Sequence, residues 1–309
     1  MGLWISGLQR KLTISNLLFP IKLIVSYLRA MVIVRRFKPN AVVGTGGFAS
    51  GPMMIAATRS RVPTLIQEQN SFAGLANRQV ADKVSRVCVA YDGMEKYFPA
   101  SKIIITGNPV RKDILSVKDK REKGKAHFGF EDSRKTLLII GGSLGARTIN
   151  ESILAGIDKL VDAGVQVIWQ TGKAYYDVVI PELANYDKRK LRVFDFLKEM
   201  DLAYAAADAV ISRSGALAVS ELCIANKPCI LVPSPNVAED HQTKNAMALV
   251  DKDAAMMVSD KEARTRLVDE ALKLLFDEHR AQKLSENIAL LARPSATEDI
   301  VNVIEELIP

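Results

Sequence analysis

The stretch Asp208-Ala-Val-Ile-Ser-Arg-Ser-Gly-Ala-Leu-Ala-Val-Ser-Glu221 decides how this chain folds. Its apolar start is typical of a buried strand, the strand stops at Ser212 to Gly215, and a helix pattern begins at Ala216. Such a turn points backbone N–H groups and the positive end of the helix dipole outward. Glu221 adds a carboxylate that accepts from vicinal hydroxyls. The pattern suits the phosphates and ribose of a nucleotide, although an ordinary strand-to-helix turn with a solvated Glu221 fits equally well.

Composition limits the possible classes of protein. The chain has 309 residues, enough for two domains, with 48% hydrophobic and 25% charged residues, as in globular proteins. The net charge of +7 is spread along the chain except near the N-terminus, which argues against a nucleic-acid surface and allows an anionic substrate or membrane face. Its three cysteines lie in apolar runs without a C-x-x-C pair, as expected of reduced core residues in a cytoplasmic protein.

A helix is predicted from Pro20 onward, because Pro20 suits a first helical position. Apolar residues repeat at helical spacing at Ile21, Ile24, Val25, Leu28 and Val32, and basic residues recur every seven positions at Lys22, Arg29 and Arg36. Polar interruptions make the segment a poor membrane-spanning helix. Apolar bulk beside a basic face favours binding at the surface of an anionic membrane. The alternative, a core helix with a solvated basic edge, fits the sequence slightly better.

Strand ends in the first half carry glycine or polar side chains. One strand runs into Gly44-Thr-Gly-Gly-Phe-Ala-Ser-Gly51, whose bare backbone lets a phosphate or sugar approach. The strand at 63–66 ends in Gln67-Glu-Gln-Asn70, where an α/β sheet places ligand-binding groups. Arg111 follows the fourth strand of this half, at 102–106, and can pair with phosphate through two hydrogen bonds, although a surface arginine is commoner.

The strand pattern indicates two domains of unequal completeness. Four strands are predicted in the first half and six in the second. Because doubly wound halves usually have similar sheets, we expect the first domain to lack an opening strand-helix unit, either because the gene start is placed late or because the protein is a fragment. The expected division is a first Rossmann-like domain at 1–115, a charge-rich linker at 116–135, a second Rossmann-like domain at 136–294 and a final helix at 295–309.

The second half opens with a strand and the turn Gly141-Gly-Ser-Leu-Gly-Ala-Arg147, in which Ser143 and the neighbouring N–H groups form a predicted anion site. An NAD site is disfavoured, because the next strand ends in Gln170 where an acidic residue would hold the ribose. His241 and Gln242 begin a helix and suit sugar hydroxyls. Scattered histidines give no convincing metal site, and Asp251-Lys-Asp253 is interpreted as a solvated loop.

Six motifs follow one another along nearly the whole chain. They are Gly44-Thr-Gly-Gly-Phe-Ala-Ser-Gly-Pro52, Glu68-Gln-Asn70, Gly107-Asn-Pro-Val-Arg111, Gly141-Gly-Ser-Leu-Gly-Ala-Arg147, Ser212-Arg-Ser-Gly-Ala-Leu-Ala-Val-Ser-Glu221 and Asp240-His-Gln-Thr-Lys-Asn-Ala246. Together they closely resemble the MurG family of peptidoglycan N-acetylglucosaminyltransferases. The resemblance implies an α/β protein of GT-B fold, with two Rossmann-like doubly wound domains facing a cleft. The first domain is incomplete, and the final helix returns to it.

The resemblance also implies site residues. The implied donor contacts are Asn70, Arg111, Ser143, Leu197 near the uracil, Ala216, Leu217, Ala218, Val219, Ser220, Glu221 on the ribose and Gln242 on the sugar. The acceptor loop consists of Gly44, Thr45, Gly46, Gly47, Ser50 and Gly51. No metal or other cofactor is implied. The family's proposed histidine base belongs to an opening glycine-rich loop that this sequence does not contain, so the catalytic residue stays unassigned.

The implied activity is inverting transfer of N-acetylglucosamine from UDP-N-acetylglucosamine to undecaprenyl-pyrophosphoryl-N-acetylmuramoyl-pentapeptide (lipid I), which forms lipid II. The implied partners are these two substrates and an anionic membrane surface, without nucleic acid. The implied location is peripheral, on the cytoplasmic face of the inner membrane. The alternatives are a catalytically impaired UDP-sugar-binding fragment, or another GT-B enzyme such as a lipid glucosyltransferase or UDP-sugar epimerase.

Overall fold

The computed structural model describes residues 2–4, 18–142 and 144–308. The chain divides into two compact units, the first formed by Met1–Asn108 with Ser295–Pro309 and the second by Pro109–Pro294. Within the described residues each unit contains one sheet, and every strand pairing in both sheets is parallel. Each unit is thus an α/β structure, as the sequence predicts.

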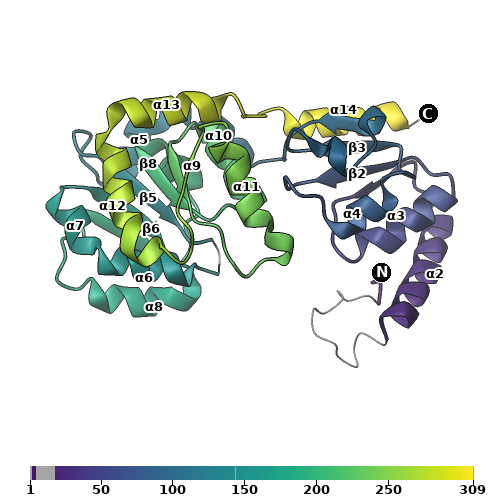
Figure 1. The fold of residues 1–309 in the computed structure, drawn as a ribbon, viewed down its shortest axis with the longest axis horizontal. Helices are drawn as coiled ribbons and strands as arrows, with labels where there is room; N and C mark the ends of the chain where they lie inside the picture. The colour runs from purple at the N-terminus through teal and green to yellow at the C-terminus, as the bar shows by residue number, and fades with distance from the viewer. Residues whose placement is uncertain (1, 5–17, 143, 309) are drawn as a thin grey trace. The chain divides into compact units, whose positions relative to one another are not determined.

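The first unit has a four-stranded sheet covered on two faces (Figure 1). Its strands, in spatial order, are β1 (Val42–Gly44), β2 (Thr64–Glu68), β3 (Arg86–Val89) and β4 (Ile103–Ile105). Its α-helices are α2 (Phe19–Phe37), α3 (Ser50–Arg59), α4 (Leu75–Val80) and α14 (Ala296–Leu307). Ile300 and Val303 of α14 pack on Leu65 and Cys88, while α3 and α4 pack on the opposite face. Every residue of β2 is buried, as expected of a parallel strand covered on both sides.

The second unit has a six-stranded sheet in the order β10-β9-β8-β5-β6-β7. The strands are β5 (Thr136–Ile140), β6 (Gln166–Gln170), β7 (Leu191–Phe194), β8 (Ala209–Ser212), β9 (Cys229–Leu231) and β10 (Met256–Met257). Counted from the β7 edge, this is the 3-2-1-4-5-6 order of a Rossmann fold. The strand order reverses between β5 and β8, and in such sheets the loops that follow the two strands at the reversal line the ligand crevice.

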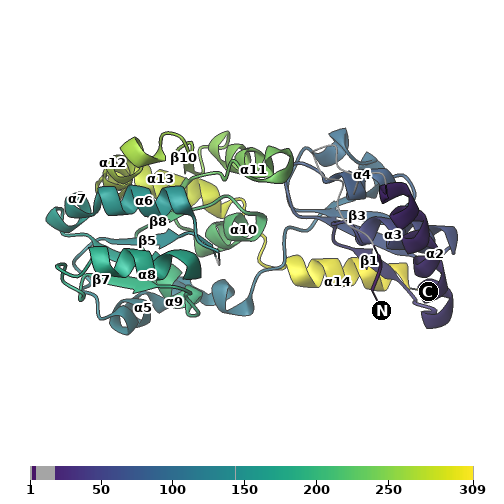
Figure 2. The ribbon, with the colours of Figure 1, turned by 90° about the horizontal axis from the view of Figure 1, so that it is seen from below.

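Helices cover both faces of this second sheet. They are α5 (Arg121–Phe128), α6 (Arg147–Ala155), α7 (Ile157–Asp162), α8 (Lys173–Glu182), α9 (Met200–Ala206), α10 (Ala216–Ala225), α11 (His241–Val250), α12 (Ala263–Phe276) and α13 (Glu278–Ala289). Buried residues of α6, α8 and α12 share one core cluster with alternate residues of β5, β6 and β8. Figure 2 shows α6 and α12 on one side of the sheet and α5 and α9 on the other.

The segment 116–135, interpreted from sequence as a linker, is built into the second unit. Its helix α5 lies directly on α9, because Gly124 has no side chain to hold the helices apart. A Cβ at Gly124 would meet the carbonyl oxygen of Leu202 at 2.5 Å and the amide nitrogen of Ala206 at 2.9 Å. The Lys125 side chain is buried, and its Nζ donates to the Thr136 hydroxyl at 2.8 Å at the start of β5. Although this segment is rich in charged residues, it packs as part of the second unit.

The helix α2 turns a different face inward from the one its apolar repeat suggests. Its buried residues are Ser26, Ala30 and Val34, and Ala30 and Val34 pack with Ala56 and Ala57 of α3. Small side chains on both helices allow this close packing. The larger residues at Ile21, Ile24, Leu28 and Val32 are 52–59% exposed. The expectation that the apolar repeat forms the core face of α2 is therefore wrong, although α2 does pack on α3. Across the residues that the structure describes, no helix is both long enough and apolar enough to cross a bilayer.

Candidate functional site

The turn after β5 is a glycine loop locked against the loop after β6. Gly142 and Gly145 adopt φ of 78° and 80°, which favours glycine. A side chain at Gly145 would strike the carbonyl oxygen of Thr171, and one at Gly172 would strike the backbone of Gly145. The two loops therefore interlock through bare backbone. Ser143, the predicted anion contact, lies outside the described residues.

The turn after β8 leads into the uncapped N-terminus of α10. Gly215 is the N-cap residue, extended at φ −66° and ψ 148°, and no side chain caps the helix. The first helical hydrogen bond runs from the Val219 amide to the Gly215 carbonyl at 3.0 Å. The amides of Ala216, Leu217 and Ala218 precede that bond and have no acceptor within the helix. This helix terminus follows β8, one of the two strands at the reversal of strand order, and its amides and dipole favour an anion.

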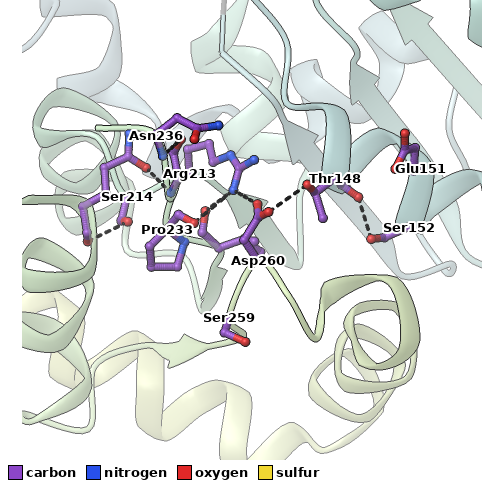
Figure 3. Close-up of polar contacts among 12 residues, drawn as sticks. Thr148, Glu151, Ser152, Arg213, Ser214, Pro233, Asn236, Ser259 and Asp260 are labelled. Atoms are coloured by element: carbon purple, nitrogen blue, oxygen red, sulfur yellow. Dashed lines mark hydrogen bonds and ion pairs between the residues drawn. The ribbon is translucent and has the colours of Figure 1, made fainter. Parts of the chain in front are cut away.

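Arg213 ties this turn to the neighbouring strand ends (Figure 3). Its Nη1 donates to the carbonyls of Val232 at 3.0 Å and Pro233 at 3.1 Å, and to Oδ1 of Asp260 at 2.6 Å. The other carboxylate oxygen of Asp260 accepts from the Thr148 hydroxyl at 2.9 Å, in the first turn of α6. The charge of Arg213 is therefore balanced inside the protein. Neither charged residue was assigned a role from the sequence.

Gln242 lies against the same turn. The Ser214 hydroxyl donates to the Gln242 carbonyl at 2.8 Å, and the Ser234 amide donates to the Gln242 Oε1 at 2.9 Å. Asn245, which is fully buried, donates from Nδ2 to the Ser214 carbonyl at 3.2 Å. These bonds fix the start of α11 beside the start of α10. They engage the oxygen of the Gln242 side chain, so its Nε2 is the group suited to donate to a sugar hydroxyl.

Glu221 lies further along α10 and contacts an interior tyrosine. The Tyr204 hydroxyl of α9 donates to Glu221 Oε2 at 3.1 Å. Burial raises the pKa of Glu221, while the Tyr204 hydrogen bond and the positive charge of Arg111 lower it. Arg111 itself pairs with Asp113 at 3.3 Å and keeps about half of its side chain exposed. The structure thus brings the two predicted donor contacts, Arg111 and Glu221, into electrostatic range of each other.

Two predicted donor residues have buried side chains. Leu197 is almost fully buried in the loop before α9, and Val219 points into the core from α10. Only their backbone atoms remain for contact with a ligand. Leu217, by contrast, is more than half exposed at the first turn of α10, and Phe196 is exposed beside Leu197. Exposed apolar side chains at these strand ends suit the flat face of a base.

Asn70 belongs to the first unit, where a buried carboxylate holds its loop. Glu68 is almost fully buried, and its Oε1 accepts from the Asn70 amide at 3.1 Å. Its Oε2 accepts from the Gly74 amide at 3.0 Å and from Asn77 Nδ2 at 2.9 Å. Glu68 thus organises the turn that carries Asn70. Asn77 was not singled out from the sequence, because it lies inside a short helix without a motif.

The predicted acceptor loop connects β1 to α3 in the first unit. A Cβ at Gly44 would meet Ser50 Oγ at 2.6 Å and Met54 Cγ at 2.9 Å, so no side chain fits there. Gly46 and Gly47 adopt φ of 83° and 77°. Thr45 is exposed, and a Cβ at Gly51 would have nothing within 4 Å. The loop thus exposes its backbone at the tip, and at its start Gly44 packs closely against Ser50 and Met54.

The described residues contain no cluster of three or more His, Cys, Asp or Glu that could hold a metal ion. Asp253, part of the Asp251-Lys-Asp253 match, instead pairs with Arg280 at 2.6 Å and Lys283 at 2.7 Å. That carboxylate therefore joins α13 to the loop before β10.

Comparison with known proteins agrees with this geometry. The models of the glycosyltransferase family 28 C-terminal and N-terminal domains match residues 136–300 and 2–89. The chain is 54% identical over 307 residues to the UDP-N-acetylglucosamine--N-acetylmuramyl-(pentapeptide) pyrophosphoryl-undecaprenol N-acetylglucosamine transferase of Cytophaga hutchinsonii, covering 99% of this chain and 82% of the relative. It is 51% identical to the protein of the same name from Parabacteroides distasonis, covering 100% of this chain and 84% of the relative.

A solved structure supports the same family. The crystal structure of Acinetobacter baumannii MurG aligns with a TM-score of 0.78 and 31% identity, covering 93% of this chain and 79% of that one. A UDP-GlcNAc 2-epimerase from Neisseria meningitidis aligns with a TM-score of 0.63 at 12% identity, covering 97% of this chain and 84% of that one, which shows a shared fold alone. The chain therefore belongs to the MurG family of N-acetylglucosaminyltransferases, within glycosyltransferase family 28, and has the GT-B fold.

Proposed function

We propose that this chain transfers N-acetylglucosamine from UDP-N-acetylglucosamine to lipid I and forms lipid II. The observation that carries the proposal is the uncapped start of α10 after β8, at the reversal of strand order, with Glu221 further along the same helix. A nucleoside diphosphate matches both parts, because its phosphates need N–H donors and its ribose offers vicinal hydroxyls. The MurG family membership supplies the identity of the sugar and of the acceptor.

The reaction is a single displacement with inversion. A hydroxyl oxygen of the acceptor attacks the anomeric carbon as the bond from that carbon to the UDP oxygen breaks. Negative charge grows on the leaving diphosphate, so preorganised N–H donors stabilise the transition state more than the ground state. The amides of Ala216, Leu217 and Ala218 supply such donors, and Arg111 supplies a positive charge nearby. The base that takes the hydroxyl proton is not assigned.

The remaining contacts follow the family motifs. In this proposal Glu221 accepts from the ribose, Gln242 donates to the sugar, and the backbone beside Leu197 flanks the uracil. Ser143, Val219 and Ser220 complete the donor contacts of the second unit. In the first unit, Asn70 supplies a donor contact. The acceptor is expected to approach the acceptor loop of the same unit, because the loop exposes its backbone; the loop consists of Gly44, Thr45, Gly46, Gly47, Ser50 and Gly51.

The membrane contact is also proposed. Lipid I is embedded in a membrane, and α2 carries an exposed apolar face of Ile21, Ile24, Leu28 and Val32. Lys22, Arg29 and Arg36 lie on the same helix. Apolar area and basic charge on one helix bind anionic lipid together more strongly than either does alone. This face supports a peripheral location on the cytoplasmic side of the inner membrane.

The test is transfer of radiolabelled N-acetylglucosamine to a lipid I analogue in anionic vesicles. We expect a labelled disaccharide lipid and release of UDP. Donor binding without transfer would instead identify a nucleotide-sugar-binding protein, and a free epimer formed without acceptor would identify an epimerase. Calorimetry with Glu221→Ala tests the donor site separately. Unchanged affinity for the UDP donor in that variant would refute the ribose contact.

A further inference from the structure

A fully buried tyrosine is hydrogen-bonded to Glu221, the carboxylate that the proposed function assigns to the ribose. Tyr204 of α9 is completely buried, and its hydroxyl donates to Glu221 Oε2 at 3.1 Å. Among the described residues, no other hydrogen bond of the Tyr204 hydroxyl is recorded. A buried phenol hydroxyl usually makes a hydrogen bond, and the hydroxyl of Tyr204 makes its hydrogen bond to Glu221. The tyrosine therefore holds the carboxylate from the inside of the protein.

The other carboxylate oxygen remains available. Glu221 is only partly buried, and none of the residues that the structure describes donates to its Oε1. A carboxylate accepts several hydrogen bonds, so one oxygen can receive the tyrosine hydroxyl while the other receives a hydroxyl from a ligand. The interior bond also restricts rotation of the glutamate side chain, which lowers the entropy lost when a ligand binds.

We propose that Tyr204 is a positioning residue that holds Glu221 ready to accept from a ribose hydroxyl, and that this pair makes the site select ribonucleoside diphosphates over their deoxy analogues. The proposal rests on the ribose contact of Glu221 in the proposed function. It adds Tyr204 as the residue that orients Glu221, and it adds the preference for ribose over deoxyribose that this orientation produces.

The charges around Glu221 support this role. Arg111 and Asp113 face it from the segment before α5, and Cys229 of β9 faces Tyr204. Burial raises the pKa of Glu221, whereas the Tyr204 hydrogen bond and the Arg111 charge lower it and Asp113 raises it. Burial also raises the pKa of Tyr204 well above its ordinary value, so the phenol stays a donor at neutral pH. The tyrosine thus favours the ionised carboxylate, the form that accepts most strongly.

The test is calorimetric titration of UDP, 2′-deoxy-UDP and 3′-deoxy-UDP into the wild type, Tyr204→Phe and Glu221→Ala. Phenylalanine keeps the ring in the core and removes only the hydroxyl. We expect the wild type to bind UDP roughly tenfold or more tightly than at least one deoxy analogue, as for a hydrogen bond to a charged group. In Tyr204→Phe this preference falls markedly because UDP binding weakens, while that analogue binds with nearly unchanged affinity.

The outcomes separate this proposal from the proposed function. Equal weakening of UDP and both analogues in Tyr204→Phe would indicate a merely structural residue and overturn the inference. Loss of the ribose preference in Glu221→Ala but not in Tyr204→Phe would overturn the role of Tyr204 and leave the ribose contact intact. A preference that survives in Glu221→Ala would overturn both.

A pH series adds a readout that packing alone does not move. Donor affinity falls on the acid side as Glu221 takes up a proton, and removal of the tyrosine hydroxyl moves that fall to higher pH. Tyr186→Phe is the matched control, because the Tyr186 hydroxyl donates to Asp158 at 2.6 Å on the surface. We expect the control to match the wild type. If donor affinity fell at the same acid pH in Tyr204→Phe and in the wild type, the proposal would be contradicted.

Discussion

Nη1 of Arg213 lies 2.6 Å from Oδ1 of Asp260, which joins the turn before α10 to the segment after β10. Both side chains are largely buried, with 16% and 19% of their area exposed. The same guanidinium nitrogen donates to the carbonyls of Val232 and Pro233, and Asp260 accepts from Thr148. A single charge pair therefore sets the ends of several strands relative to one another. Because Arg213 is already paired, the proposed function assigns the diphosphate to the α10 amides and not to Arg213.

Asp260→Asn tests this pair. The substitution leaves the Arg213 guanidinium largely buried without its anion, and we expect the free energy of unfolding to fall by roughly 1–3 kcal/mol in urea titration. The control is Asp269→Asn, which removes the partner of Lys159 from an exposed pair at 2.6 Å. That change costs less than about 1 kcal/mol. Equal losses in the two variants would mean that the Arg213 pair contributes no more than a surface contact.

Gly44 ends β1 and Gly51 lies in the first turn of α3, and we expect alanine at these two positions to have opposite effects on stability. Gly44→Ala places a methyl group against Ser50 and Met54, so we expect a loss of roughly 1–3 kcal/mol of unfolding free energy. Gly51→Ala places a methyl group in open space in the first turn of α3, where alanine favours the helix. We expect Gly51→Ala to be at least as stable as the wild type.

Transfer to lipid I separates the structural role of Gly51 from a role in acceptor binding. If the acceptor approaches the bare backbone of this loop, Gly51→Ala raises the KM for lipid I although the protein is fully stable. An unchanged KM for lipid I would show that the acceptor does not contact Gly51. Thermal unfolding of both glycine variants, measured on the same preparations, ensures that a loss of activity is not a loss of folded protein.

Local pattern was enough to predict the strand-to-helix turns. The glycine turns after β1 and β5 and the turn after β8 were recognised because apolar runs end there in glycine or serine. The four-stranded and six-stranded sheets agree with the strand counts expected from the sequence. The motif order predicted the MurG family, which the comparisons confirm.

Contacts between distant residues were not predictable in the same way. Asp260 is 47 residues from Arg213, and Tyr204 is 17 residues from Glu221, so neither pair leaves a periodic signal within one element. The burial of α2 shows a different limit. The apolar repeat was recognised correctly, but the side that packs is decided by the small residues Ala56 and Ala57 of α3. Periodicity locates an apolar face without saying whether the protein itself covers it.

The exposed face of α2 predicts membrane binding. Ile24→Glu replaces an exposed apolar side chain by a charge that opposes both insertion and attraction to anionic lipid. We expect roughly tenfold weaker co-sedimentation with vesicles of phosphatidylglycerol and phosphatidylethanolamine, and unchanged transfer to a water-soluble acceptor analogue. Val301→Glu is the matched control, because Val301 is an exposed apolar residue on α14 of the same unit. Equal vesicle binding by Ile24→Glu and the control would refute the assignment of this face.

Lys227 predicts how stability depends on pH. It follows α10, and its Nζ donates to the Ala207 carbonyl at 2.8 Å. Burial lowers the pKa of Lys227 from 10.5 to about 8, although Asp208 opposes the shift. Between these two values the unfolded chain binds more protons at this residue than the folded protein does. The contribution of Lys227 to stability therefore rises with pH across this window, and its unfavourable effect is fully present below a pH of about 8.

Lys227→Met removes this titration together with the hydrogen bond to Ala207. The lost hydrogen bond lowers stability at every pH, whereas the relief of the buried charge raises it only while the wild-type lysine is protonated. We therefore expect the free energy of unfolding of the variant, relative to that of the wild type, to be highest near neutral pH. It should fall steadily as the pH rises from about 8 toward 10. Urea unfolding of both proteins across this range measures the difference. A difference that stays constant with pH would show that the folded protein does not shift the proton equilibrium of Lys227.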